Sequence, residues 1–152
     1  MQKGNRRAEN RRARFDIAVE ETLEAGISLT GDEIKSIRAE RVQLTGAYVK
    51  LMQGTNPQAL PKVVVVGMHL GLAGEPERTR SLLLHAREVR MLQEQLSAKG
   101  KTAVPLDLHM KRGWAKLTIG IGTGRKKSDK RNLLRERAVL RDLELTAKRG
   151  RR

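Results

Sequence analysis

The sequence predicts a single α+β domain of 152 residues, built mainly from antiparallel β-strands with two or three helices beside them. Three observations predict this class. Apolar and polar residues alternate in short runs, the four valines at 63–66 are too β-branched and too few for a stable helix, and residues 104–121 have the pattern of a β-hairpin. With 38% hydrophobic residues, the chain can bury one core.

Strands and turns account for most of the expected elements. An Ala25-Gly26 turn divides the first apolar run into two strands, and residues 53–61 and 71–77 are expected to be loops because they contain glycine and proline. Residues 78–84 are compatible with either a strand or an extended loop. The expected strands are residues 16–23, 27–29, 46–52 and 62–68, followed by the two strands of the hairpin.

Two helices are expected in the body of the protein. Thr30 and Glu33 have the spacing of a capping box, in which each side chain binds a free amide of the first helical turn, so a short helix is predicted over residues 31–40. Apolar residues at helical spacing, ended by Gly100, predict an amphipathic helix over residues 86–99.

The hairpin turns a defined set of side chains outward. Its strands are joined by a two-residue Arg-Gly turn, and successive side chains of a strand point to opposite faces. Burying Leu117 and Ile119 therefore exposes Lys116 beside Trp114. The alternative is that Trp114 packs on a helix at one end of a barrel. The number and order of the strands and helices suggest a closed or nearly closed antiparallel barrel comparable to the oligonucleotide-binding (OB) folds.

Charge is concentrated at the two ends of the chain. Of a net charge of +15, residues 1–14 carry six Lys or Arg against one Glu, and residues 125–152 carry twelve against four acidic residues. Residues 15–124 hold fourteen basic and twelve acidic residues. Because each Lys or Arg placed against a phosphate releases counterions, this distribution predicts a nucleic-acid partner. The alternative is that both basic ends are solvated tails.

The composition argues against several other classes. There is no cysteine, so disulfides and thiolate metal sites are excluded, and only three aromatic residues are available for stacking on bases. Recognition of backbone and shape is therefore expected. No run approaches the roughly 20 apolar residues that span a bilayer, and no apolar signal segment follows the basic N-terminus. We therefore expect a cytoplasmic protein.

Catalytic motifs are not evident. His69, His85 and His109 lack the spacing of metal ligands, and no phosphate-binding loop or nucleophile elbow occurs. Glu20 and Glu24 share a strand face, but no second acidic segment completes a metal site. We expect no enzymatic activity, no metal and no cofactor. Two alternatives stay open: a metal-dependent nuclease, and a structural ribosomal protein with a small basic barrel and a tail that threads rRNA.

Five separated blocks carry a family resemblance: Asn10–Arg14, Glu20–Ile27, Leu29–Ala39, Arg78–His85 and Gly122–Arg131. In this order and spacing, they resemble the SsrA-binding protein (small protein B) family of bacterial RNA-binding proteins. The resemblance implies an OB-like barrel that grips the tRNA-like domain of transfer-messenger RNA and helps to rescue stalled ribosomes. It also implies a tail that forms a helix in the empty mRNA path, against small-subunit rRNA near the decoding centre.

The sequence departs from the family pattern at three positions. Phe15 stands where a histidine is usual, Glu40 stands where a glycine commonly ends the first helix block, and Ser128 replaces a bulkier residue. These departures bear on local contacts and helix ends, and they leave the five blocks intact.

The resemblance also implies a set of RNA-binding residues. In it, Asn10 would offer its amide to a base or sugar, and Glu24 would accept from a base edge or ribose hydroxyl or else orient an arginine. Leu83 would be either core or a support for the RNA-binding surface. Gly122 and Gly124 would let the backbone approach phosphate in a flexible exit from the barrel. The expected RNA-binding residues are Asn10, Arg11, Arg12, Arg14, Glu24, Arg78, Arg80, Leu83, Trp114, Lys116, Gly122, Gly124, Arg125, Lys126 and Lys127.

Three parts of the chain are expected: a basic arm at 1–9, the barrel at 10–124 and a basic tail at 125–152. Leucines of the tail share a rough helical face, so we expect it to be disordered in the free, monomeric protein and helical on the ribosome. The alternative is a third packed helix. The expected ribosome contacts of the tail are Asp129, Lys130, Arg131, Arg135, Leu140 and Leu143.

Overall fold

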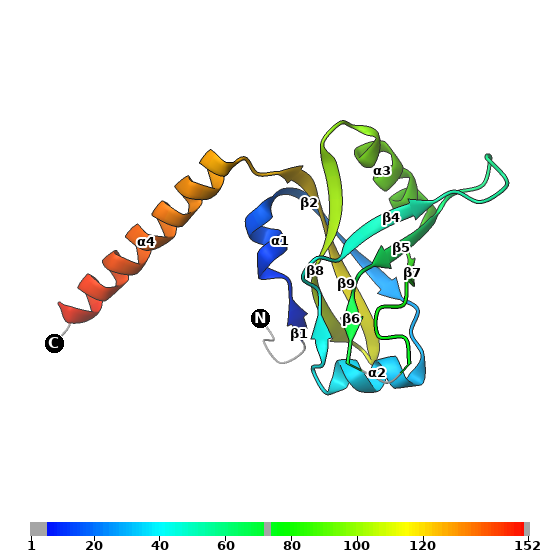
Figure 1. The fold of residues 1–152 in the computed structure, drawn as a ribbon, viewed down its shortest axis with the longest axis horizontal. Helices are drawn as coiled ribbons and strands as arrows, with labels where there is room; N and C mark the ends of the chain where they lie inside the picture. Colours follow the sequence, from blue (N-terminus) through cyan, green and yellow to red (C-terminus); the bar gives the residue numbers. More distant parts are fainter. Residues whose placement is uncertain (1–5, 72–73, 151–152) are drawn as a thin grey trace.

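The computed structural model describes residues 6–71 and 74–150, which form an α+β fold with a large antiparallel sheet and four helices (Figure 1). The elements are β1 (Arg6–Glu9), α1 (Arg11–Asp16), β2 (Ile17–Ile27), α2 (Gly31–Arg38), β3 (Val42–Gln43), β4 (Tyr48–Met52), β5 (Lys62–Val66), β6 (His69–Leu70), β7 (Arg80–Leu83), α3 (Ala86–Ser97), β8 (Lys101–Lys111), β9 (Trp114–Gly124) and α4 (Lys127–Arg149).

Seven strands form one sheet in the order β1-β8-β9-β2-β7-β5-β4, and β3 pairs with β6 in a small second ladder. Every pairing is antiparallel, which confirms the expected strand direction. Within the described residues the sheet order ends at β1 and β4 with no ladder between them. Closure into an OB-like barrel therefore stays a prediction.

The predicted turn at Ala25-Gly26 is wrong. The strand β2 continues through both residues to Ile27, and Gly26 pairs with Lys116 on β9 and with Leu83 on β7. A Cβ atom on Gly26 would lie 3.3 Å from Cβ of Leu83. This glycine therefore permits close approach of a neighbouring strand rather than a change of chain direction.

The hairpin of β8 and β9 is confirmed. Arg112 and Gly113 have φ angles of 52° and 81°, as both central residues of a type I′ turn require. Leu117 and Ile119 are fully buried while Trp114 is 72% exposed, so the expected division of faces is correct and the alternative of Trp114 packed on a helix is wrong.

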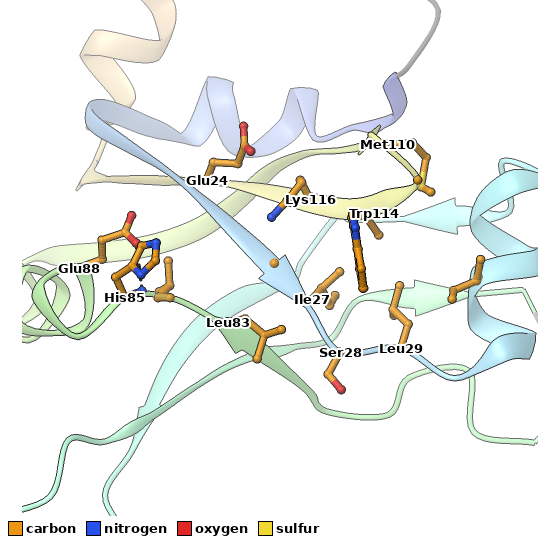
Figure 2. Close-up of a pocket in the computed structure, with 15 residues that line it drawn as sticks. Glu24, Ile27, Ser28, Leu29, Leu83, His85, Glu88, Met110, Trp114 and Lys116 are labelled. Atoms are coloured by element: carbon orange, nitrogen blue, oxygen red, sulfur yellow. Dashed lines mark hydrogen bonds between the residues drawn. The ribbon is translucent and has the colours of Figure 1, made fainter.

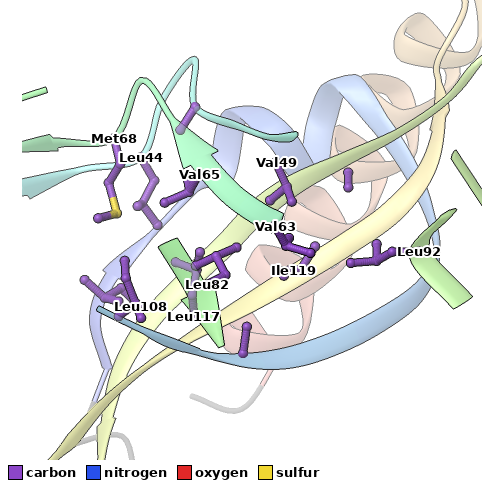
Figure 3. Packing of buried hydrophobic residues seen from close by; sticks show 14 of the residues in the cluster. Leu44, Val49, Val63, Val65, Met68, Leu82, Leu92, Leu108, Leu117 and Ile119 are labelled. Carbon is purple, nitrogen blue, oxygen red and sulfur yellow. The ribbon is translucent and has the colours of Figure 1, made fainter. Parts of the chain in front are cut away.

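The main core is formed largely by buried side chains of the strands, several of which are labelled in Figure 3. It joins Leu92 of α3 and Ile37 of α2 to the inner faces of the strands. A smaller cluster of Ala13, Val104 and Leu106 lies beneath α1, which the sequence analysis did not predict. A register shift in β8 just before Asp107 interrupts the strict alternation of inward-facing and outward-facing side chains that was expected for this strand.

Helices α2 and α3 are confirmed, with slightly shorter bounds than predicted. Thr30 and Glu33 form the capping box, with both reciprocal hydrogen bonds present. Just beyond α2, Glu40 has a φ angle of 59°, a left-handed conformation that favours glycine. This conformation explains why a glycine is common at that position in the resembled family.

Both ends of the chain carry regular secondary structure within the described residues. Residues 6–9 form β1 and pair with β8, so this part of the expected arm belongs to the sheet, while residues 1–5 lie outside the described residues. Helix α4 projects away from the body, and none of its residues is buried (Figure 1). No described helix, α4 included, combines the length and apolar character needed to cross a membrane. Disorder of the tail in the free protein stays a prediction.

Candidate nucleic-acid interface

Four of the expected RNA-binding residues line one pocket of about 790 Å³ (Figure 2). Trp114 and Lys116 come from β9, Glu24 comes from β2, and Leu83 comes from β7. The side chain of Leu83 is 63% exposed because Leu82 before it points into the core. The pocket thus combines an apolar surface and an indole with a cation and a carboxylate.

Gly26 sets the shape of this pocket. In the register of the sheet it lies between Leu83 on one side and Lys116 on the other. Because glycine has no side chain, the surface between these two residues is left open. Met110 and His85 also line the pocket, although the sequence did not predict them as site residues. Met110 lies on β8 and His85 directly precedes α3, so the pairing of the sheet and the position of α3 bring them to the pocket.

Glu24 is held by two cationic or ionisable groups of β8. Lys111 Nζ lies 3.4 Å from Glu24 Oε1, and His109 Nε2 lies 3.5 Å from Glu24 Oε2. Among the described residues these ion pairs join Glu24 to Lys111 and His109, and its orientation of an arginine stays a prediction. Lys111 and His109 were missed because they lie 87 and 85 positions away along the chain, although the outward face of the hairpin includes both.

The arginines of α1 differ in their exposure to solvent and in their ion pairs. Arg11 and Arg12 are exposed, and Arg12 Nε lies 2.9 Å from Asp16 Oδ2 one turn later. Arg14 is half-buried and lies 3.8 Å from Asp107 on β8. Arg11 and Arg12 can therefore reach phosphates, whereas Arg14 connects α1 to the strand next to the pocket.

Asn10 does not have the role that the sequence suggested. It is 1% exposed, and its amide group donates hydrogen bonds to the carbonyls of Leu44 at 3.0 Å and Pro105 at 2.9 Å. Its side-chain oxygen accepts from the backbone N–H of Ala13 at 3.1 Å and so caps α1. With these groups satisfied inside the protein, Asn10 fixes the start of α1 instead of contacting a base.

Arg80 is also removed from the expected interface. It is fully buried, forms an ion pair with Glu33, and donates to the carbonyls of Met68 at 2.8 Å and Pro76 at 3.1 Å. Arg78 lies 2.5 Å from the other oxygen of the same carboxylate but remains partly exposed. Only Arg78 of this pair can contact RNA.

Burial by itself would raise the pKa of Glu33. Hydrogen bonds from Arg78, from the backbone N–H of Thr30 and from Arg80 outweigh burial and lower the pKa to about 2. The carboxylate is thus charged and ties the start of α2 to β7, which carries Leu83 to the pocket.

The glycines of β9 serve the sheet. Gly122 is buried, and a Cβ atom there would overlap the carbonyl oxygen of Ala18 on β2. The expected approach of Gly122 to phosphate, as part of a flexible exit, is therefore wrong. Gly124 ends β9 in open space and is exposed.

The exposed lysines Lys126 and Lys127 follow Gly124 at the start of α4, and half-buried Arg125 donates its backbone N–H to Asp16 O at 2.7 Å.

The first turns of α4 are anchored to α1. Lys130 Nζ lies 3.0 Å from Asp16 Oδ1. The pKa of Asp16 is lowered by its hydrogen bond with Lys130, against the effect of burial, and further by Arg12. The cationic groups of Arg12, Lys130 and Arg137 lie 5.7, 5.8 and 5.8 Å from the centre of the Phe15 ring. Phe15 therefore gathers positive charge where α1 meets α4.

The remaining tail residues follow a single exposed helix. Asp129 Oδ2 accepts from the backbone N–H of Lys126 at 3.3 Å, so Asp129 caps α4 as well as lying in the expected contact set. Leu140 and Leu143 are 59% and 61% exposed. Arg131 and Arg135 are exposed as well.

A family model described as SmpB protein matches residues 7–149. The chain belongs to the SmpB protein family. An SsrA-binding protein of Acaryochloris marina is 43% identical in an alignment of 148 residues that covers 94% of each chain. One of Leuconostoc mesenteroides is 42% identical in an alignment of 143 residues that covers 90% of this chain and 88% of the relative.

A solved structure of an SmpB family member has a similar fold. It is described as "tmRNA-SmpB: a journey to the center of the bacterial ribosome", and the matched chain is 35% identical with a TM-score of 0.63. The match covers 84% of this chain and 94% of the solved chain. The family expected from the five sequence blocks is therefore confirmed.

Proposed function

We propose that this chain binds the tRNA-like domain of transfer-messenger RNA and delivers it to stalled ribosomes in trans-translation. The observation that carries the proposal is the pocket formed by Glu24, Leu83, Trp114 and Lys116, on a chain that matches SsrA-binding proteins along nearly its whole length. In this role the chain is an RNA-binding factor of the cytoplasm with no reaction of its own.

The pocket residues supply complementary contacts to a folded RNA. An exposed indole can stack on an unpaired base, a contact worth about 1–3 kcal/mol per base, and Lys116 can bind a phosphate. Glu24 can accept hydrogen bonds from a base edge or from a ribose hydroxyl. The exposed arginines Arg11 and Arg12 add phosphate contacts on α1, beside the exposed start of the tail.

The tail supplies a second RNA-binding surface in this proposal. Residues 125–152 carry twelve basic residues, and α4 exposes both its arginines and its leucines. Such a helix can lie along ribosomal RNA in the mRNA channel near the decoding centre, with arginines on phosphates and leucines in a groove. The barrel region, residues 10–124, then binds transfer-messenger RNA while the tail contacts the small subunit.

The deciding experiment compares affinity for the tRNA-like domain with affinity for an ordinary tRNA across a salt series. A preference for the tRNA-like domain that persists as salt weakens both complexes supports the proposal, because phosphate contacts alone are sequence-independent. Equal affinities at every salt concentration would reduce the chain to a general polyanion binder and refute the proposal.

A further inference from the structure

Glu24 is connected to the interior of the sheet through His109. Asp107 has a side chain only 10% exposed, and its Oδ1 accepts a hydrogen bond from the Thr118 hydroxyl at 3.1 Å. His109 Nδ1 lies 2.9 Å from that same oxygen, and its Nε2 lies 3.5 Å from Glu24 Oε2. The imidazole thus bridges a nearly buried carboxylate under the surface and a half-exposed carboxylate in the pocket.

The bridge depends on the charge of the imidazole. An ionised carboxylate only accepts hydrogen bonds, so Asp107 favours a proton on His109 Nδ1. In the charged imidazole Nε2 also carries a proton and attracts Glu24. In the neutral ring with its proton on Nδ1, Nε2 presents a lone pair to Glu24, and the contact becomes repulsive. The charged form of the imidazole is therefore the form that holds Glu24.

We propose that His109 is a positioning residue for RNA binding: its charged imidazole, oriented by Asp107, fixes the Glu24 carboxylate where it accepts a hydrogen bond from RNA. This inference rests on the proposed binding of a tRNA-like RNA. A carboxylate on an RNA-binding surface repels phosphates unless its charge is offset and its direction is set. A protonated His109 does both at once, because its Nε2 faces Glu24 while its Nδ1 is held by Asp107 from below.

Charged groups face His109 from each strand packed against it. Lys111 shares the hold on Glu24 at 3.4 Å, so loss of His109 weakens the positioning without abolishing it. The charged groups are Asp107 and Lys111 on β8, Glu24 on β2, Lys116 opposite His109 on β9, and Arg14 beside Asp107 on α1.

The test measures the affinity of the full-length protein for the tRNA-like domain at pH 6 and constant ionic strength. His109→Phe keeps the ring and removes both nitrogens, so it should weaken binding about fivefold, the effect of a partly exposed ion pair. His69→Phe is the matched control, because His69 also faces a carboxylate, Glu77 Oε1 at 3.5 Å, but lies outside the pocket. It should leave the affinity unchanged.

A double-mutant cycle separates positioning from a direct contact. If His109 acts through Glu24, then His109→Phe should have no further effect in a Glu24→Gln background. Losses that add, or an affinity of His109→Phe within about twofold of wild type at pH 6, would overturn the inference while leaving RNA binding by the wild type intact. If the wild type itself shows no preference for the tRNA-like domain, the proposed function fails instead.

A spectroscopic measurement keeps the inference testable if His109→Phe does not fold. The ¹⁵N chemical shifts of the His109 imidazole report its protonation and its hydrogen-bond partners. Replacing Glu24 by Gln should shift these signals at pH 6 to 7, and the His69 signals should stay in place. Unchanged His109 shifts would overturn the inference.

Discussion

Replacing Glu33 by glutamine tests how much the buried ion pair with Arg80 stabilises the fold. The two side chains are 2% and 0% exposed. Burial alone would raise the pKa of Glu33, but its hydrogen bonds from Arg78, Thr30 and Arg80 lower the pKa from 4.5 to about 2. The folded protein therefore binds a proton at this carboxylate less readily than the unfolded chain does.

This difference sets both the magnitude and the pH range of the effect. A shift from 4.5 to about 2 corresponds to a contribution of about 3 kcal/mol to the free energy of unfolding. Because the folded pKa is the lower one, the contribution is complete above the unfolded value of 4.5 and is lost as the pH falls from there toward 2. In Glu33→Gln the charge of Arg80 stays buried without a counter-ion, so we expect a loss of about 3–5 kcal/mol at pH 7.

Urea unfolding followed by circular dichroism measures this loss. Glu88→Gln is the matched control, because Glu88 holds the same position in α3 and accepts from the backbone N–H of His85 at 3.0 Å, without a buried arginine. Glu88→Gln should lower the free energy of unfolding by about 1 kcal/mol or less. The difference in free energy of unfolding between wild type and Glu33→Gln should become smaller below pH 4.5. Equal losses for the two variants, or a difference that is unchanged at pH 2.5, would refute the reasoning.

Three further predictions concern RNA binding and the tail. Lys116→Ala should weaken binding to the tRNA-like domain and reduce the salt dependence of binding by about one phosphate contact. Lys50 is exposed on β4 outside the pocket, so Lys50→Ala should change neither quantity. Equal effects of the two substitutions would argue against RNA binding at the pocket. Deleting residues 132–152 should leave affinity for this RNA nearly intact and abolish ribosome rescue, so a large loss of affinity would contradict the two-surface arrangement. Asp16→Asn should weaken the contact with Lys130 and speed amide hydrogen exchange in the first turns of α4, and unchanged exchange would show that this contact does not anchor the helix.

Local patterns predicted the elements that depend on neighbouring residues. The capping box at Thr30 and Glu33 and the type I′ turn before Trp114 are satisfied within a few positions of the chain, and both are present. The Ala25-Gly26 turn failed because the same glycine also serves where two strands approach closely. Sequence alone does not distinguish these two uses of glycine.

The candidate site was predicted in part. Strand alternation brought Trp114 and Lys116 to one face, and the family resemblance added Glu24 and Leu83. His109 was considered only as a metal ligand and was not predicted as a site residue, because its carboxylate partner on β2 is 85 positions away. Pairing of β2 with β9, and of β9 with β8, brings the two side chains together.

By itself, the sequence determined the family, the antiparallel α+β class, the outward face of the hairpin and the uneven distribution of charge. These properties follow from composition, from side-chain alternation and from turns, all of which involve residues close together in the chain. Only the tertiary structure decided which polar side chains remain free to bind RNA. Asn10 is buried by contacts with Leu44 and Pro105, 34 and 95 positions away, and such burial depends on the packing of the whole sheet.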